Sequence, residues 1–323
     1  MDLEMLEKRA SVIKRIRSFF DSKNYLELDT PLLSENLIPE SCLEVFETER
    51  LYPLGSSHQG CGEKNSPMYL IPSPEIWMKQ IIAKHKVDVF QVCKCFRNGE
   101  SCGRLHNSEF TMLEYYTMEA DYMDSLALTE QLFDYLAGEE NNRCLRPPFE
   151  RITVADAFMR WAGFDLFSAA GIPGAMEEHC HRFGIDPPKG TTIGGLYDLI
   201  FIQEVEPNLK MEKPVALIDY PAFVPCLAKK SNDGKTVERW ELYYNGIELA
   251  NCFSEETDPQ AVKEFFISEA AEKEKTALVK HNVDHNYWKM FKDFPHCSGV
   301  AMGVDRLIMA LCGRSSIDGV IPF

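Results

Sequence analysis

The chain has 323 residues, 45% of them hydrophobic, a composition typical of a folded globular protein that buries a full core. Its 50 acidic residues outnumber 34 basic ones and give a net charge of −16. This excess argues against broad nucleic-acid binding, which depends on Lys and Arg that neutralise phosphates, although a small basic site fits within an acidic body.

Eleven cysteines are scattered along the chain. A disulfide framework is one interpretation, but their odd number and the length of the chain favour free thiols in a reducing cytoplasm. The first residues, MDLEMLEKRA, carry acids and no apolar run, so we expect no signal peptide. No apolar stretch approaches the roughly 18 residues of a membrane span. The sequence therefore predicts a cytoplasmic protein without a membrane partner.

The first part of the chain predicts a helix, a short strand and a region of loops. Apolar residues recur at helical spacing through residues 3–20. The segment YLELDTPLL, residues 25–33, reads as a short strand that ends at Pro31. Residues 36–68 are rich in Gly, Ser and Pro, which favours loops or an irregular hairpin.

A second helix is predicted in SPEIWMKQIIAK, residues 73–84. Ser73 suits the N-cap, Pro74 suits the first helical position and Glu75 suits the first turn. Two strands follow, because VDVFQVCKCFR and its antiparallel return EFTMLEYY both alternate in hydrophobicity.

The remaining elements are helices and one clear hairpin. Residues 121–137 and 153–205 look mostly helical, and residues 258–281 form an amphipathic helical pattern. The segment WELYYNGIELANCF, residues 240–253, contains Asn-Gly, the preferred two-residue hairpin turn. GVAMGVDRLIMALCG, residues 299–313, reads as a strand that runs into a helix. This order predicts an α+β fold with a largely antiparallel sheet flanked by helices.

The predicted hairpin brings two carboxylates together. With the Asn-Gly pair as the turn, Tyr243 lies opposite Glu248, and Glu241 lies opposite Ala250. Glu241 and Glu248 are then diagonal neighbours on one face, about 7–8 Å apart. Carboxylates at this separation can share a hard divalent cation. A solvated acidic face is the alternative interpretation.

Three further residues of this region, Asn251, Phe253 and Glu255, are odd-numbered, so strand alternation places them on the face opposite to that of Glu248. A bulge near Cys252 would be needed to bring both sets of side chains to one site.

The segment FRNGESCGRLHNSEFTMLEYY concentrates charged residues between strand-like flanks. Arg97 ends one strand, and Glu114 and Tyr116 share a face of the next. An arginine in this position is either a structural ion-pair partner or a forked phosphate clamp, and spacing alone leaves both interpretations open.

The segment GVAMGVDRL places Gly303 and Arg306 where a strand meets a helix. Glycine allows a ligand to approach the backbone closely, and a helix N-terminus favours phosphate. A Gly-rich turn by itself is weak evidence for a nucleotide site.

Together, these segments resemble a known family. The FRNGESC to LEYY segment is similar to motif 2 of class II aminoacyl-tRNA synthetases, YYNGIELANCFSEETDP to the strands before motif 3, and SGVAMGVDRLIMAL to motif 3. The lysyl subgroup is the most similar. YLELDTPLL matches motif 1, SPEIWMK the substrate-binding S-P-E-x-x-x-K, and VIPF the closing segment. The resemblance implies a single class II synthetase-like catalytic domain over residues 1–323.

Lysyl-tRNA synthetases carry an anticodon-binding domain before motif 1, whereas here the motif 1 helix begins almost at the first residue. The chain therefore resembles the short paralogues that activate a lysine-type amino acid with ATP and transfer it to a lysine side chain of elongation factor P. The resemblance implies ATP as a substrate, lysine or β-lysine and elongation factor P as partners, a homodimer formed through motif 1, and no binding of tRNA. A stand-alone lysyl-tRNA synthetase-like enzyme and a catalytically inactive regulatory paralogue are the alternatives.

The resemblance also assigns site residues. Arg97 matches the arginine that holds the α-phosphate of ATP, and Arg306 matches the one on the γ-phosphate, so these two are the expected catalytic residues. Glu241 and Glu248 match the carboxylates that hold Mg2+ on the phosphates. The expected ATP-binding residues are Arg97, Asn98, Glu100, Asn107, Glu241, Leu242, Gly303 and Arg306. The expected amino-acid-binding residues are Ser73, Pro74, Glu75, Glu114, Tyr116, Glu248, Asn251 and Glu255.

The sequence departs from the family at three points. Gly99 interrupts the usual F-R-N-E and lengthens the motif 2 loop, and Cys252 replaces a usual glycine in E-L-A-N-G-F. Ala301 stands where lysyl-tRNA synthetases have glycine, as in the short paralogues. We expect its methyl group to reshape the pocket and to favour β-lysine over α-lysine, by an amount on the order of 1–3 kcal/mol, although the sequence leaves the isomer open.

Overall fold

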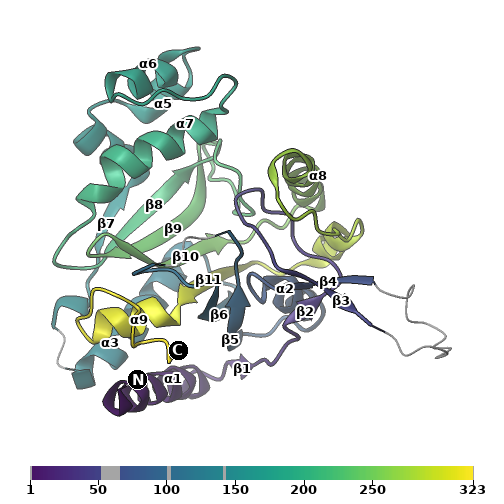
Figure 1. Ribbon diagram of the computed structural model, residues 1–323, viewed down its shortest axis with the longest axis vertical. Helices are drawn as coiled ribbons and strands as arrows, with labels where there is room; N and C mark the ends of the chain where they lie inside the picture. Colours follow the sequence, from purple (N-terminus) through teal and green to yellow (C-terminus); the bar gives the residue numbers. More distant parts are fainter. Residues whose placement is uncertain (1, 52–65, 100–102, 141–142, 323) are drawn as a thin grey trace.

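The computed structural model describes residues 2–51, 66–99, 103–140 and 143–322. An eight-stranded sheet runs through its centre (Figure 1). In sheet order, the strands are β1 (Leu26–Glu27), β5 (Val89–Phe96), β6 (Glu109–Met118), β11 (Cys297–Gly303), β10 (Ile247–Ser254), β9 (Thr236–Tyr244), β8 (Val215–Pro221) and β7 (Glu150–Thr153). Neighbours are antiparallel except at the two edges, where β1 pairs with β5 and β7 with β8. The predicted α+β class is confirmed.

A smaller three-stranded sheet lies beside the large one. Its strands, in sheet order, are β2 (Leu33–Ser34), β4 (Ser66–Leu70) and β3 (Glu47–Arg50). The short strand predicted to end at Pro31 is confirmed as β1 of the large sheet, and the chain then enters β2 of the small sheet at Leu33. Pro31 lies between them and has no N–H to donate to a ladder. The irregular hairpin predicted within residues 36–68 corresponds to β3 and β4, and residues 52–65 lie outside the described residues.

Helices α1 (Leu3–Ser22), α3 (Tyr122–Glu140) and α9 (Val304–Leu311) cover one face of the large sheet (Figure 1). Helix α1 buries Val12, Ile16 and Phe20, which recur every four residues and so lie on one side of the helix. The Phe20 ring stacks on Phe90 of β5 with the centroids 4.9 Å apart. This apolar face holds the main hydrophobic core and leaves the opposite face of the central strands for polar side chains.

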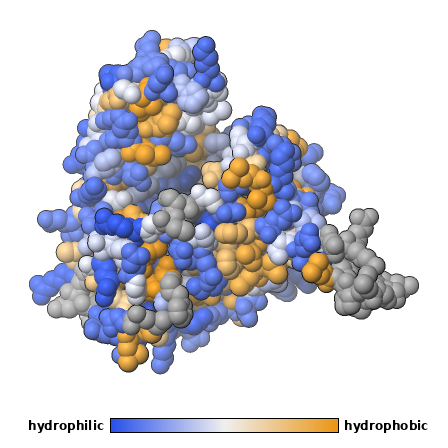
Figure 2. Space-filling view, in the orientation of Figure 1, coloured by the Kyte–Doolittle hydropathy of each residue, from blue (hydrophilic) through white to orange (hydrophobic). Residues whose placement is uncertain are grey.

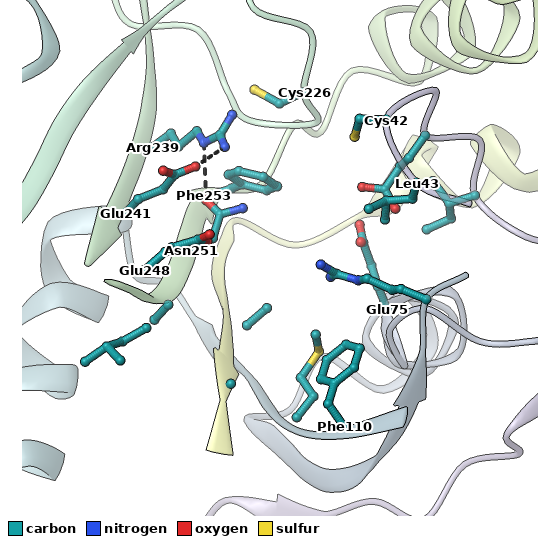
Figure 3. Close-up of a pocket in the computed structure, with 18 of the residues that line it drawn as sticks. Cys42, Leu43, Glu75, Phe110, Cys226, Arg239, Glu241, Glu248, Asn251 and Phe253 are labelled. Atoms are coloured by element: carbon teal, nitrogen blue, oxygen red, sulfur yellow. Dashed lines mark hydrogen bonds and ion pairs between the residues drawn. The ribbon is translucent and has the colours of Figure 1, made fainter. Parts of the chain in front are cut away.

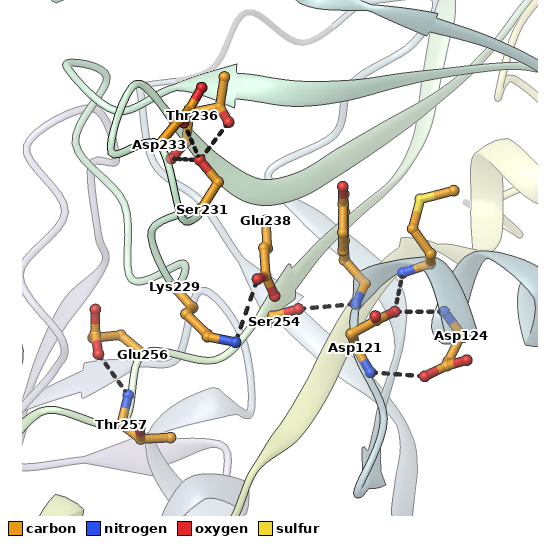
Figure 4. A network of polar contacts seen from close by, with 12 residues as sticks. Asp121, Asp124, Lys229, Ser231, Asp233, Thr236, Glu238, Ser254, Glu256 and Thr257 are labelled. Atoms are coloured by element: carbon orange, nitrogen blue, oxygen red, sulfur yellow. Dashed lines mark hydrogen bonds and ion pairs between the residues drawn. The ribbon is translucent and has the colours of Figure 1, made fainter.

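A polar network fixes the start of α3 against the sheet (Figure 4). The backbone N–H of Asp124 donates to the Asp121 carboxylate at 2.9 Å, and the N–H of Asp121 donates back to Asp124 at 3.1 Å. Ser254, at the end of β10, accepts a hydrogen bond from the N–H of Tyr122 at 2.9 Å. These contacts satisfy N–H groups that a helix start leaves without intrahelical partners.

The opposite face of the sheet is covered at its two ends. A lobe of short helices packs over β7 to β9, and it comprises α4 (Val154–Ala157), η2 (Phe158–Ala162), α5 (Leu166–Ala170), α6 (Ala175–Arg182), α7 (Ile193–Ile200), η3 (Phe201–Val205) and η4 (Glu206–Asn208). The other end is covered by α2 (Glu75–His85), α8 (Pro259–Thr276) and η5 (Tyr287–Asp293). The short η1 (Arg143–Leu145) follows α3. The surface is hollowed between the lobe of short helices and the part that carries α8 (Figure 2).

Most predicted helices are confirmed, with differences at their ends. The region 153–205 forms a series of short helices. The helix predicted for residues 258–281 ends at Thr276. The carboxylate of Glu44 accepts hydrogen bonds from the N–H groups of Leu278 and Val279, at 2.9 and 3.2 Å, which draws the chain away from the helix. Among the described helices, none is long and apolar enough to cross a membrane.

Candidate active site

Strand pairing aligns polar residues in a row across the uncovered face of the sheet. Gln91 of β5 lies opposite Glu114 of β6, which lies opposite Ala301 of β11. Ala301 in turn lies opposite Asn251 of β10, and Asn251 opposite Glu241 of β9. Because directly paired residues point to the same face, these five side chains form one line, which we call the polar row.

The register of the β9–β10 hairpin differs from the prediction beyond the turn. Tyr243 lies opposite Glu248 as expected, but Ala250 lies opposite Leu242 and not opposite Glu241. The pairing shifts between Glu248 and Ala250, so the strand gains one residue there. Glu241 and Glu248 remain diagonal neighbours on one face.

This shift is a β-bulge at Leu249, and the expected bulge near Cys252 is therefore wrong in its position. An extra residue reverses the alternation of side chains along the strand. Asn251 consequently faces the same side as Glu248 and lies directly opposite Glu241. The bulge thus joins the two sets of side chains that the sequence pattern placed on opposite faces.

A cavity of about 590 Å³ opens on this face of the sheet (Figure 3). Predicted site residues that line it are Glu75, Arg97, Asn107, Glu241, Glu248, Asn251, Gly303 and Arg306. They come from α2, the end of β5, the loop before β6, the β9–β10 hairpin and the β11–α9 junction. The cavity is therefore built from segments far apart in the sequence, which matched motif 2, motif 3, the strands before motif 3 and the S-P-E-x-x-x-K segment.

Other predicted site residues lie away from the cavity wall. The side chain of Leu242 is fully buried in the core on the opposite face, so only its backbone is available to a nucleotide. The Asn98 amide donates to the carbonyl of Val45 at 3.3 Å. Ser73 Oγ accepts a hydrogen bond from the N–H of Glu75 at 3.2 Å, and Pro74 takes the N-cap position that was predicted for Ser73. Glu100 lies outside the described residues.

Arg306 ties together three segments at one end of the cavity. Its guanidinium donates to the carbonyl of Glu248 at 2.8 Å and to the carbonyl of Leu105 at 3.2 Å, and it lies 3.2 Å from a ring nitrogen of His106. Arg97 lines the same cavity, with its guanidinium carbon 5.2 Å from the centre of the Phe110 ring. Two arginines on one concave surface suit a polyphosphate, since the guanidinium fork matches phosphate oxygens.

The start of α9 is held in place by a buried ion pair. Arg9 of α1 contacts the Asp305 carboxylate at 2.5 Å and donates to Thr111 Oγ1 at 2.7 Å. The other Asp305 oxygen accepts the backbone N–H of Thr111 at 2.7 Å. This network fixes the helix N-terminus next to Gly303 and Arg306, where a phosphate is favoured electrostatically.

The two carboxylates predicted to hold a metal ion differ in their surroundings. Glu241 is held in place by Tyr220 and Tyr243, whose hydroxyls donate to one of its oxygens at 2.6 and 2.7 Å. Arg239 also pairs with Glu241 (Figure 3). The Glu248 side chain stays 42% exposed at the cavity mouth, and partial desolvation there, together with the nearby charge of Glu241, raises its pKa to about 7. A divalent cation would stabilise such crowded carboxylates.

The described residues contain no group of three or more His, Cys, Asp or Glu side chains arranged for a metal. A cation held by Glu241 and Glu248 would therefore take further ligands from bound substrate, as Mg2+ does in phosphate sites.

Behind the cavity lies a buried cluster around Lys79, the last residue of the SPEIWMK motif, which the set of expected site residues did not include. Lys79 of α2 is fully buried and contacts Glu75 at 2.5 Å and Glu255 at 2.6 Å. In the same cluster, the Tyr116 hydroxyl donates to Glu114 at 2.7 Å. Lys79 lies four residues after Glu75 in the SPEIWMK segment, and this helical spacing was the signal that could have revealed the pair.

Burial shifts the pKa values of the carboxylates in this cluster. Burial raises the pKa of Glu255 to about 7 in spite of Lys79, and it raises the pKa of Glu114 well above its ordinary value, with the charge of Glu75 adding to the effect. Lys79 stays protonated, because Glu255 and Glu75 together outweigh its desolvation. Several carboxylates with one internal ammonium form a site suited to further positive charge.

Comparison with known proteins assigns the chain to a family. A family model described as tRNA synthetases class II (D, K and N) matches residues 2–323. The chain belongs to this family. Proteins named elongation factor P–(R)-beta-lysine ligase are 36% identical in Histophilus somni strain 2336, 33% in Avibacterium paragallinarum and 32% in Vibrio atlanticus strain LGP32. Each alignment covers 99% of this chain and 95% of the relative. As a class II synthetase-type protein with ligases as relatives, the chain is an ATP-dependent ligase.

Gly299 lies in β11, the motif 3 strand, and its lack of a side chain leaves the space that Glu255 and Tyr116 of the buried cluster occupy. A Cβ at Gly299 would lie 2.6 Å from Glu255 Oε1 and would overlap the Tyr116 ring. Both neighbours are almost fully buried and cannot move aside. The sequence pattern showed this glycine in SGVAMGVDRL but gave no reason to separate it from the others.

We expect Gly299→Ala to lower the free energy of unfolding by about 1–3 kcal/mol through overpacking and to raise the KM for the amino acid about tenfold or more. The KM for ATP should stay unchanged, because the overlap lies away from the arginines. Steady-state kinetics and chemical denaturation check both effects. Gly171→Ala is the control, since its Cβ would meet nothing closer than 3.5 Å, and equal effects in the two variants would contradict the expectation.

Proposed function

We propose that this chain activates lysine or β-lysine with ATP as an aminoacyl-adenylate and transfers the aminoacyl group to a lysine side chain of elongation factor P. The observation that carries the proposal is one cavity that Arg97 and Arg306 both line and, behind it, a buried cluster of carboxylates. The relatives named for this activity support it, since they match 99% of the chain.

The arginines serve the nucleotide. Arg97 binds the α-phosphate, Arg306 binds the γ-phosphate, and Gly303 lets the nucleotide approach the sheet closely. Asn98, Glu100, Asn107 and the backbone of Leu242 are the further proposed ATP contacts. Glu241 and Glu248 would hold Mg2+, which neutralises phosphate charge when it is bound.

The first step is an in-line attack of the substrate carboxylate on the α-phosphorus, with pyrophosphate as the leaving group. In the second step the ε-amine of the acceptor lysine attacks the carbonyl of the adenylate, the bond between this carbonyl and the AMP oxygen breaks, and AMP leaves. No protein side chain acts as a nucleophile. Arg97 stabilises the charge that develops on the phosphate, and positioning supplies the rest of the acceleration.

The acidic cluster serves the amino acid. Glu75, Glu114 and Glu255, with Tyr116, form a pocket for a substrate that carries two ammonium groups, because each buried ammonium needs a charge partner. Asn251 and Glu248 border it on the cavity side, and Ser73 and Pro74 position the start of α2. Ala301 lines the cavity between the two regions, and its methyl group favours β-lysine.

Four further features complete the proposal. Residues 1–323 act as one catalytic domain that does not bind tRNA and works in the cytoplasm. Two copies form a homodimer through motif 1. The support for the dimer is apolar exposure near β1 and β2, where Leu26, Leu32 and Leu33 are 54%, 37% and 41% exposed, a pattern typical of association surfaces.

The test is mass spectrometry of elongation factor P after incubation with the purified protein, ATP and each lysine isomer in turn. We expect the mass of one lysyl group on the acceptor, with β-lysine the better donor. Charging of tRNA without a mass shift on the factor would instead indicate a lysyl-tRNA synthetase-like enzyme. Absence of both, together with no lysine-dependent pyrophosphate exchange, would indicate an inactive paralogue.

A further inference from the structure

The polar row ends in a buried amide to which no family motif gives a role. Gln91 is 1% exposed, and neither its Nε2 nor its Oε1 has a hydrogen-bond partner among the described residues. A buried amide without partners costs free energy, and a methionine of similar shape would remove that cost. Its presence therefore indicates that something else satisfies it.

The position of Gln91 points to the amino-acid pocket. Asn251 and Ala301 line the cavity, whereas Glu114 and Gln91 continue the polar row into the protein beyond the cavity wall. Gln91 lies directly opposite Glu114. The row thus leads from the cavity, where the substrate carboxylate meets the phosphate, to a blind end at Gln91.

Other unsatisfied polar atoms gather at this blind end. Oε2 of Glu114 is buried and has no hydrogen-bond partner within the described part of the chain, and the same is true of the Tyr287 hydroxyl. Tyr287 lies close enough to Lys79, Glu255 and Glu114 to feel their charges. Glu114 thus has an unpaired acceptor beside Gln91 and an unpaired hydroxyl nearby, which suits a ligand group with several N–H donors, such as an ammonium group.

The choice of an amide also fits the charge of the cluster. Glu75, Glu114 and Glu255 already face a single internal ammonium, that of Lys79. A carboxylate in place of Gln91 would add a further buried negative charge, whereas a carboxamide adds an acceptor without charge.

We propose that Gln91 is a specificity-determining residue at the blind end of the amino-acid pocket, where its carboxamide oxygen accepts a hydrogen bond from the side-chain ammonium of the substrate, next to Glu114. The inference rests on the proposed function and adds a substrate contact to it. Gln91 takes no part in the chemical steps.

The test compares the wild type with Gln91→Met in lysine-dependent pyrophosphate exchange and thermal unfolding. We expect the KM for the preferred lysine isomer to rise at least tenfold and the KM for ATP to stay unchanged. The melting temperature of the free protein should rise, because the variant removes an unsatisfied buried amide. Opposite signs for stability and affinity separate a substrate contact from a structural residue, whose loss would not weaken binding selectively.

A second readout is the preference for lysine over norleucine, which lacks the side-chain amine. We expect the ratio of their kcat/KM values to fall at least tenfold in Gln91→Met. Gln91→Asn should show the same loss, because its amide is one methylene shorter, and it keeps the test valid if methionine is not tolerated. Gln80→Met is the matched control, since Gln80 of α2 is exposed, and its kinetics should equal those of the wild type.

The outcomes are distinguishable. A wild-type KM and a wild-type preference for lysine over norleucine in both Gln91 variants would overturn the role of Gln91 and leave the proposed function intact. Absence of exchange with every lysine isomer in the wild type would overturn the proposed function and this inference with it.

Discussion

Replacement of Arg306 by alanine is expected to lower the rate of lysine-dependent pyrophosphate exchange by about 100- to 1,000-fold, the loss typical of a group that stabilises transition-state charge. Arg306 lines the cavity and stands at the start of α9, where the buried pair of Asp305 and Arg9 fixes the helix. Its guanidinium also holds the carbonyls of Leu105 and Glu248, so alanine removes both the proposed phosphate partner and the link between two cavity walls. The exchange assay measures the first step alone and needs no acceptor protein.

Two further variants make this result interpretable. Arg306→Lys keeps the charge but loses the fork, so we expect a rate between those of the wild type and the alanine variant. Arg314→Ala is the surface control, because Arg314 lies just beyond α9 with a side chain that is 44% exposed, and its rate should not change. An Arg306→Ala enzyme that folds and exchanges at the wild-type rate would remove the phosphate role from Arg306.

Replacement of Lys79 by methionine is expected to destabilise the fold by about 3–5 kcal/mol, because it leaves buried carboxylates without their cation. Lys79 is fully buried, and it contacts Glu75 and Glu255 at 2.5 and 2.6 Å. The protein that remains folded should have lost amino-acid activation, since the two carboxylates border the pocket. Denaturant unfolding gives the free energy, and the exchange assay gives the activity.

The stability that Lys79→Met loses should depend on pH, and the direction of this dependence follows from Glu255. Burial raises the folded-state pKa of Glu255 from 4.5 to about 7 even with Lys79 present, and removal of Lys79 raises it further. Between the unfolded and folded pKa values the folded chain binds more protons than the unfolded chain, so its stability falls as the pH rises. The difference between wild type and Lys79→Met should therefore be smallest near pH 5 and should grow towards pH 8.

An exposed lysine provides the matched control for Lys79. Lys275 pairs with Glu272 at 3.0 Å on the surface of α8, with a side chain that is 70% exposed. Lys275→Met should change the free energy of unfolding by less than about 1 kcal/mol, as is usual for surface pairs. A Lys79→Met variant that matches this control at every pH would show that the buried pair is not needed for stability.

Much of the fold and of the candidate site could be predicted from the sequence. The alternation in β5 and β6 and the Asn-Gly turn of the β9–β10 hairpin are local signals, and the structure confirms each of them. The motif segments also identified eight residues that line one cavity. Local periodicity and turn chemistry suffice for this, because they depend on neighbours in the chain.

Other features depended on contacts that no local pattern contains. The bulge at Leu249 puts Asn251 on the same face as Glu241, and its position follows from how β10 pairs with both of its neighbours. The pairing of Lys79 with Glu255 joins α2 to the segment after β10. Likewise, only the register between β5 and β6 shows that Gln91 lies opposite Glu114.

The sequence by itself determined the order and type of most elements, the family and eight of the residues that line the cavity, because each of these is written in short, contiguous patterns. The tertiary structure alone decided which buried charges neutralise one another, where the strand register shifts and which glycine must stay small. These features depend on distances between segments that are remote in the chain. In a close-packed, poorly solvated interior, a buried charge that moves a few ångströms from its partner changes from stabilising to destabilising.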